Sequence, residues 1–185
     1  MAAWWGRERA ASLWRRCRGI DESPIQVEGD RRSVSSERTF ARDVDVDTEL
    51  EAALLAQVVD ASSSLRSRGL FARTITVKLR SAEFRDHSRG RTVESPVQTE
   101  RAIFTVAREL LGELRVRHPG AVRLIGVGLT NLGPVGDPEQ GRLLEVTPPP
   151  EDDRDRALAR ATDRLRDRFG RDAVRPGRLL PRDRR

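Results

Sequence analysis

The sequence predicts an α+β fold, in which a four-stranded, mainly antiparallel sheet carries two helices on one face. Two stretches, 49–68 and 99–117, have apolar residues at every third or fourth position, which is typical of amphipathic helices. Two others, 70–83 and 121–131, alternate apolar and polar residues as half-buried strands do. Their order along the chain, strand, helix, strand, strand, helix, strand, builds one sheet with both helices on the same face.

Length and composition allow one well-packed core with appendages. The chain has 185 residues, of which 37% are hydrophobic and 35% charged, so some of it is expected to pack loosely. We divide it into a short helix (1–21), a linker (22–31), the sheet domain (32–131), a Pro/Gly-rich linker (132–150) and a helical tail (151–185).

The N-terminal helix is expected to need a packing partner. Trp4, Trp5, Leu13 and Trp14 are its apolar positions, and Gly19 ends it. Three tryptophans require more buried surface than so short a segment can supply. The helix therefore looks like the last helix of a larger domain.

The first strand of the domain is expected from Arg32 to about Phe40, and the first helix from about Glu49 to Arg68. Thr48 and Glu51 have the spacing of a capping box at the start of this helix. Gly69 closes it.

A hairpin is expected in the middle of the domain. From Leu70 to Glu83 the apolar residues Ile75, Val77 and Leu79 alternate with polar ones, so the apolar set faces the core. The short polar connection 85–87 leads into a second strand from Ser88 to Val93.

The second helix, 99–117, ends at Pro119-Gly120 and is followed by the fourth strand, 121–131. That strand is predicted to turn Ile125, Val127 and Leu129 inward and Gly126 and Gly128 outward. Glycines on the outer face permit a ligand to approach the backbone closely. A last helix, about 151–169, has only a narrow apolar stripe and is expected to pack weakly or to bind a partner.

Positive charge is concentrated in the central strands. The net charge is +6, Lys78 is the only lysine, and the segment 70–93 holds six basic residues against two acidic ones. We predict that Lys78 and Arg80 share one sheet face with Arg89 and Arg91, because phosphates would offset the repulsion between like charges on neighbouring strands. The predicted DNA-backbone contacts are Arg32, Ser33, Ser35, Lys78, Arg80, Arg89, Arg91, Thr92, Arg123 and Gly126.

Other kinds of site are not indicated. Cys17 is the only cysteine, so no disulfide forms within the chain, and no window is long and apolar enough to span a membrane. The separated His87 and His118 lack metal-ligand spacing, and no catalytic triad or phosphate-binding glycine loop is present. A soluble, intracellular protein without a membrane partner is expected.

Four segments in a fixed order resemble the C-terminal region of Y-family translesion DNA polymerases of the DNA polymerase IV group. The family's linker and first strand are similar to Arg32–Phe40, and its central strands to Arg73–Arg80 and Ser88–Thr92. Its last strand resembles Val122–Leu129, and the end of its thumb domain resembles Trp5–Asp21. Ser35 stands where the family has a glycine that approaches a phosphate, and Gly128 stands where relatives often have a basic or polar residue.

The resemblance implies a DNA-binding little finger domain at 32–131, preceded by a remnant of the thumb. It also implies a bacterial, cytosolic and nucleoid-associated protein whose partner is double-stranded or primer-template DNA. The family's catalytic palm and fingers do not fit in the residues before Asp21, so we expect no catalytic residue, metal or cofactor in this chain, no activity of the chain alone, and Mg²⁺ only in the full-length family.

A sliding clamp is a further expected partner. Gln140, Leu143 and Leu144 loosely match the peptide by which relatives bind the clamp, and a polar linker is the alternative interpretation.

Two other functions remain open. An RNA-binding domain of the RRM type has the same order of elements, but it stacks bases on aromatic residues of its central strands. A docking subunit would use Trp4, Trp5, Trp14 and the last helix to bind a separately encoded catalytic half of a split polymerase.

Overall fold

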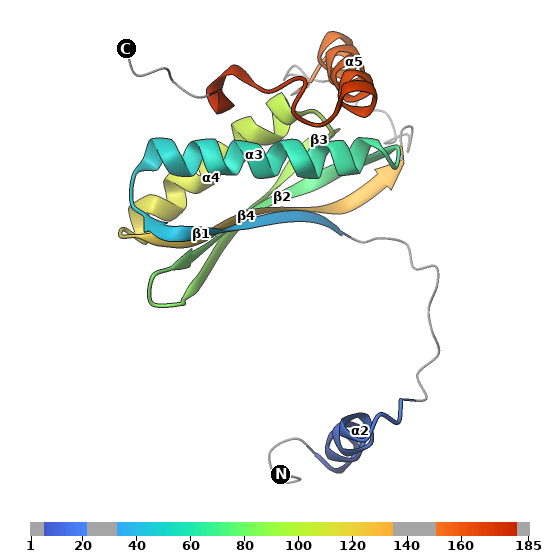
Figure 1. Cartoon of the computed structure of the whole chain (residues 1–185), viewed down its shortest axis with the longest axis vertical. Helices are drawn as coiled ribbons and strands as arrows, with labels where there is room; N and C mark the ends of the chain where they lie inside the picture. The colour runs from blue at the N-terminus through green and yellow to red at the C-terminus, as the bar shows by residue number, and fades with distance from the viewer. Residues whose placement is uncertain (1–5, 22–32, 135–150, 181–185) are drawn as a thin grey trace. The chain divides into compact units, whose positions relative to one another are not determined.

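The computed structural model describes residues 6–21, 33–134 and 151–180 of the chain, which forms two compact units, Met1–Asp30 and Arg31–Arg185 (Figure 1). The first unit contains helix α2 (Arg7–Cys17), and none of the residues in this helix is buried. Trp14 is 57% exposed, and the Arg18 guanidinium lies 3.8 Å from the centroid of its ring. Helix α2 therefore leaves its apolar side chains available, and the predicted contributions of Trp4 and Trp5 lie outside the described residues.

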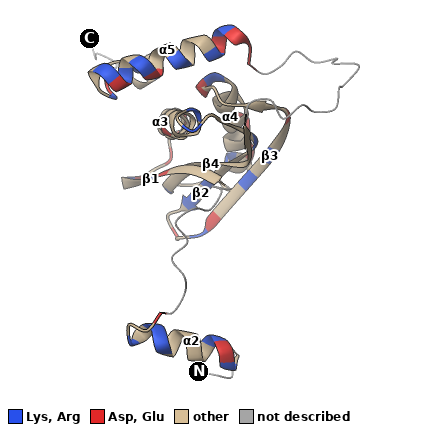
Figure 2. Ribbon diagram, turned by 90° about the vertical axis from the view of Figure 1, so that its right-hand side faces the viewer, with Lys and Arg blue, Asp and Glu red and all other residues tan. Residues whose placement is uncertain are grey.

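The second unit has the predicted α+β fold, which is confirmed. Its elements in chain order are β1 (Ser33–Val44), α3 (Asp47–Arg66), β2 (Leu70–Ser81), β3 (Asp86–Val97), α4 (Glu100–Arg117), β4 (Val122–Pro134), α5 (Asp153–Phe169) and the 3₁₀ turn η1 (Gly177–Leu179). The strands form one antiparallel sheet in the order β1-β4-β2-β3. Helices α3 and α4 cover one face of it (Figures 1 and 2).

The core lies between this sheet and the two helices. Ile75 and Val77 of β2 and Leu129 of β4 are completely or almost completely buried, as the alternating pattern predicts. From the helices, Leu54 and Ile103 are fully buried against them. Because most apolar residues of the four strands turn to this side, the opposite face of the sheet is left mainly to polar and small residues.

Several boundaries differ from expectation, and β1, β3 and β4 each run further than predicted. Helix α3 begins at Asp47, and its N-cap residue Val46 provides no side-chain hydrogen bond, so the predicted capping box of Thr48 and Glu51 is wrong. Instead, Arg115 of α4 donates to the Asp47 carboxylate over 2.7 Å and holds the first turn. Strand β3 continues to Val97, where a shift in its register with β2 accommodates the extra residues.

Helix α5 lies on the outer side of the helix layer (Figure 1). The segment that follows it returns to α3, where Arg178 lies 3.6 Å from Glu51. Within the described ranges, no helix is both long enough and apolar enough to cross a membrane.

Candidate nucleic-acid interface

The face of the sheet that α3 and α4 leave open is defined by the strand pairing. Residues directly opposite each other on neighbouring antiparallel strands point to the same side. Lys78 of β2 is opposite Gly126 of β4 and Ser88 of β3, and Gly126 is opposite Glu37 of β1. These four positions form one row across the sheet, and the rows on either side of it follow by steps of two residues.

Small polar residues make up most of this surface, which we call the open face. Three further rows are Ser33-Thr130-Thr74-Thr92, Ser35-Gly128-Thr76-Gly90 and Thr39-Leu124-Arg80-Asp86. Hydroxyl-bearing or glycine residues therefore occupy most of the sixteen positions, and none of them is aromatic. Hydroxyls and backbone amides are common donors to the phosphates of nucleic acids.

The hydroxyls of neighbouring strands are close enough to order one another. The side-chain oxygens of Thr74 and Thr92 are 2.9 Å apart, and the Asn131 side-chain amide donates to Thr74 Oγ1 over 2.8 Å. Such contacts hold the hydroxyls in fixed positions at one end of the open face. A ligand at this end meets donors that are already oriented.

The three glycines of the open face differ in how closely neighbouring atoms approach them. A Cβ at Gly126 would lie 2.6 Å from Glu37 Cγ, and one at Gly90 would lie 2.8 Å from Thr76 Oγ1, so both positions are crowded by neighbouring strands. A Cβ at Gly128 would meet nothing within 4 Å. Gly128 is thus a point at which a ligand can approach the backbone without meeting a neighbouring side chain.

Charge on the open face is paired. Lys78 Nζ lies 3.6 Å from Glu37 Oε1 and 3.6 Å from Asp86 Oδ2, and Arg80 holds Asp86 with two hydrogen bonds. The hydrogen bond from Arg80, helped by the charges of Arg80 and Lys78, lowers the pKa of Asp86 to about 2. The same contact raises the pKa of Arg80. The two cations are therefore accessible, but each already has a carboxylate partner.

Arg89 and Arg91 do not lie on the open face, so the prediction that they share it with Lys78 and Arg80 is wrong. They are opposite Val77 and Ile75, which point into the core, so the arginines point to the helix side. There Arg89 donates to Glu113 of α4 and Arg91 donates to Glu109 and Glu113. These contacts, chiefly the one from Arg89, lower the pKa of Glu113. The alternation of the two faces within each strand was predicted correctly, but the pairing register between β2 and β3 was not.

The remaining predicted contacts are distributed as follows. Ser33, Ser35, Thr92 and Gly126 lie on the open face with Lys78 and Arg80. Arg123 lies 3.6 Å from Asp43 and stacks 4.7 Å from the centroid of the Phe84 ring, at the end of the β2–β3 hairpin. Arg32 and the predicted clamp-binding residues Gln140, Leu143 and Leu144 lie outside the described residues.

Several open-face residues were not among the predicted contacts. Thr74, Thr76 and Thr130 belong to the two central strands, and Ser88 and Gly90 belong to β3. In 74–80, threonines alternate with core residues, and this pattern indicated that Thr74 and Thr76 face away from the core. Ser88 and Gly90 could be found only by knowing which residues of β2 they face.

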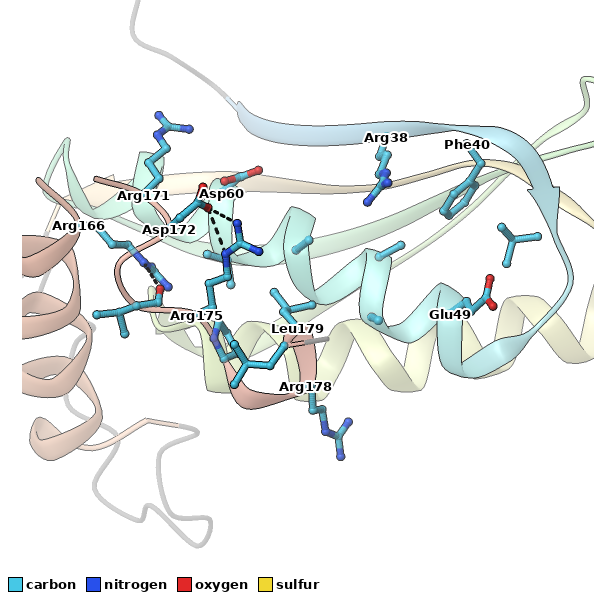
Figure 3. Close-up of a pocket in the computed structure, with 18 residues that line it drawn as sticks. Arg38, Phe40, Glu49, Asp60, Arg166, Arg171, Asp172, Arg175, Arg178 and Leu179 are labelled. Atoms are coloured by element: carbon cyan, nitrogen blue, oxygen red, sulfur yellow. Dashed lines mark hydrogen bonds and ion pairs between the residues drawn. The ribbon is translucent and has the colours of Figure 1, made fainter. Parts of the chain in front are cut away.

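A large hollow in the described part of the second unit lies on the helix side, away from the open face. It has a volume of about 820 Å³ and lies between β1, α3 and the segment after α5 (Figure 3). Arg38 and Phe40 of β1 line it, and Arg175, which binds Asp172 in the same wall, closes it on the other side (Figure 3). No group of three or more His, Cys, Asp or Glu residues able to hold a metal ion occurs among the described residues.

The second unit is thus an α+β domain whose antiparallel sheet has one open face rich in hydroxyl-bearing and glycine residues. Residues 31–143 match the impB/mucB/samB family C-terminal domain. The chain belongs to this family and carries the C-terminal, little finger domain of a Y-family polymerase of the DNA polymerase IV type.

Individual relatives agree with this assignment. The chain is 37% identical over 171 residues to a DNA polymerase IV of Caulobacter vibrioides, which covers 91% of this chain and 40% of that protein. It is 35% identical over 141 residues to a DNA polymerase IV of Xanthomonas euvesicatoria, with 76% and 39% covered. The chain thus spans about two fifths of the length of these curated relatives.

A solved structure shares the fold. An insertion ternary complex of Dbh DNA polymerase aligns with a TM-score of 0.50 at 21% sequence identity, over 68% of this chain and 36% of the other. At this identity the likeness shows the fold alone.

Proposed function

We propose that the open face of the little finger domain binds the sugar-phosphate backbone of double-stranded or primer-template DNA. The observation that supports this most strongly is the row Ser35-Gly128-Thr76-Gly90, in which no side chain is larger than threonine across all four strands. A backbone strand of DNA could approach the sheet closely along this row. Hydroxyls and main-chain amides would then contact phosphate oxygens, which carry no base identity.

The cations of the open face would contribute by exchanging partners. Lys78 is 32% exposed and sits between two carboxylates at 3.6 Å, distances that are long for a tight ion pair. A phosphate that replaces these carboxylates would keep the Lys78 ammonium paired, so the exchange would not leave this cation without a partner. Glu37 and Asp86 would at the same time repel the backbone, so they direct it toward the neutral rows of the open face.

Duplex affinity measured against salt concentration tests this proposal. We expect the logarithm of the association constant to fall linearly with the logarithm of salt concentration, because each neutralised phosphate releases counterions. Lys78→Gln should weaken binding of any duplex sequence and reduce the slope by about one. A slope near zero in the wild type, or an unchanged slope in Lys78→Gln, would contradict a backbone contact at this residue.

The role of the whole protein is a further proposal, because this chain spans only part of its relatives. We propose that residues 32–131 help a polymerase IV-type enzyme bind damaged DNA during translesion repair synthesis, with nucleotide transfer and its Mg²⁺ supplied by a palm and fingers outside residues 32–131. Gln140, Leu143 and Leu144 stay a predicted clamp-binding segment. A binding assay with the clamp and a triple-alanine variant of these residues would test it.

An RNA-binding function of the RRM type is not favoured. That mode of recognition stacks bases on aromatic residues of the central strands. Here the central strands β4 and β2 present Thr, Gly, Lys, Arg and Leu124 to the open face. Tighter binding of single-stranded RNA than of primer-template DNA would reverse this ranking.

A docking role for the first unit has one supporting observation. Leu13 and Trp14 of α2 are about half exposed, and no residue of this helix is buried. Copurification of the chain with a palm-fingers polypeptide, lost in Trp14→Ala, would support docking. A stable complex that survives this substitution would contradict it.

A further inference from the structure

Helix α5 is fixed to the domain at its start by a buried carboxylate. Glu151 is only 1% exposed, and its Oε2 accepts hydrogen bonds from the main-chain N–H groups of Gln98 and Thr99 and from the Thr99 hydroxyl, all within 3.0 Å. Thr99 is the N-cap of α4. A negative charge at this position also interacts favourably with the positive end of the α4 dipole.

A second polar contact fixes the middle of α5. The Arg66 side chain, at the end of α3, is 4% exposed and binds Asp163 of α5 on one side and Glu100 of α4 on the other, at 2.6 to 3.1 Å. Arg166 reaches Glu100 from α5 and donates to the Val174 carbonyl (Figure 3). The position of α5 is therefore set by paired charges that are buried or half-buried.

These contacts hold the helix without using its apolar residues. Ala159 is the only residue of α5 that is buried, whereas Leu158, Leu165 and Phe169 are 66%, 45% and 63% exposed. Their spacing of seven and four residues places all three along one side of the helix. The narrow apolar stripe predicted from the sequence exists, but it faces solvent rather than the core.

The stripe borders a groove between α4 and α5. This hollow has a volume of about 430 Å³, and its apolar walls are formed by Leu55, Phe104, Leu158, Ala159, Val174 and Pro176. Phe104 comes from α4 and Leu158 from α5, so both helices supply a large apolar side chain. An apolar residue of a partner that entered the groove would contact both.

Basic residues lie near this groove on both helices, whereas the acidic residues that line it, Glu100 and Asp155, are already paired with arginines. On α4, Arg101 is exposed and pairs with Asp155 at 2.9 Å, while the exposed Arg108, about two turns further on, has no ion pair among the described residues. On α5, Arg164 and Arg168 are exposed beside the stripe and likewise have no ion pair in the described ranges. Figure 2 shows basic residues recurring along α5.

We propose that the α4–α5 groove is a docking site for an acidic amphipathic helix of a partner protein. Its apolar side chains would enter between Phe104 and Leu158 and cover Leu165 and Phe169. Its flanking carboxylates would meet Arg108, Arg164 and Arg168. Charge complementarity favours this occupant, because the exposed residues Arg108, Arg164 and Arg168, which have no ion pair within the described ranges, are all basic. A helix laid in a groove is also a common mode of recognition.

Fluorescence anisotropy with a designed peptide tests the proposal. The probe is a labelled helical peptide with leucine at positions i, i+3, i+7 and i+10 and glutamate on the flanks. Two matched peptides replace the glutamates by glutamine or the leucines by alanine. We expect saturable binding of the probe to the full chain, and binding weaker by about tenfold or more for each matched peptide, which corresponds to about 1.4 kcal/mol.

Variants locate the site. Leu158→Glu should weaken probe binding by about tenfold or more, since it places a charge in the groove without disturbing the core. Val116→Glu is the matched control, because Val116 is 85% exposed on α4, about 18 Å along the helix from Phe104. It should bind the probe as the wild type does. Equal binding by Leu158→Glu and the wild type, or no saturable binding of the probe, would overturn the proposal.

Other ligands of the same surface are outcomes of the same experiment. Vesicles rich in phosphatidylglycerol and a thymidine oligonucleotide are tested in place of the peptide. If one of them binds, the peptide does not, and Leu158→Glu abolishes this binding, the proposal is overturned and the groove is assigned to lipid or nucleic acid. Duplex binding serves as an independent readout. We expect Leu158→Glu to leave it unchanged, so a failure of the docking proposal is distinguishable from a failure of DNA binding by the open face.

Discussion

Val77 of β2 and Arg89 of β3 are directly opposite each other and point to the same side of the sheet, the side that α4 covers. Because Val77 is completely buried, the guanidinium of Arg89 cannot reach the open face without leaving its strand register. It binds Glu113 instead. The cations available to a ligand on the open face are therefore Lys78 and Arg80 within the described strands.

Arg91→Gln should affect DNA binding less than Lys78→Gln. Both substitutions remove one positive charge, but Arg91 faces α4 and is held by Glu109 and Glu113. The measurement is duplex affinity for both variants at the same salt concentration. A larger loss for Arg91→Gln would mean that DNA contacts the edge of β3 rather than the open face.

The three glycines of the open face should respond differently to alanine. Gly126→Ala and Gly90→Ala place a Cβ within 3 Å of neighbouring atoms and should lower the free energy of unfolding by about 1–3 kcal/mol. Gly128→Ala meets no atom within 4 Å and should leave stability close to that of the wild type. Denaturant unfolding of the three variants checks this difference in stability. A destabilised Gly128→Ala would contradict the free space found at this position.

Asp86 should make stability fall in acid. Its pKa of about 2 lies below the ordinary value of about 3.9 for an unfolded chain, so its contribution is fully present above pH 4 and is lost as the pH falls toward 2. Denaturant unfolding at several pH values should therefore show a smaller decline between pH 4 and pH 2 in Asp86→Asn than in the wild type. Parallel pH profiles for the two proteins would show that Arg80 does not stabilise the carboxylate.

Glu151→Ala should release α5. It leaves the N–H groups of Gln98 and Thr99 buried without an acceptor, which costs about 1–3 kcal/mol in the free energy of unfolding. Limited proteolysis should then cut within 151–180 faster than in the wild type. Asp153→Ala is the control, because the Asp153 side chain is fully exposed, and it should change neither quantity.

The sequence was sufficient to predict the elements and the core, because hydrophobic periodicity reports directly on which residues are buried. Ile75, Val77 and Leu79 were assigned correctly for this reason. The composition of the open face was only partly predictable. Which residues of β3 face Lys78 depends on the register across the hairpin, and a shift of one residue reverses the face of every side chain.

The polar contacts between distant elements could not be predicted at all. Glu151 reaches Thr99 across 52 residues, and Arg66 joins Asp163 across 97. No local pattern reveals such partners, since each residue alone resembles an ordinary surface charge. The same limit applies to Glu113, whose pairing with Arg89 and Arg91 removes both arginines from the predicted interface.

The most direct test of the central claim compares Gly128→Glu with Gly112→Glu in a duplex-binding assay. Both positions are glycines with free space, so each variant should fold, but Gly128 lies on the open face and the exposed Gly112 lies on α4. The account predicts that Gly128→Glu loses duplex affinity by about tenfold or more while Gly112→Glu stays within about twofold of the wild type. Equal affinities for the two variants, or a greater loss for Gly112→Glu, would show that DNA does not bind to the open face of the sheet.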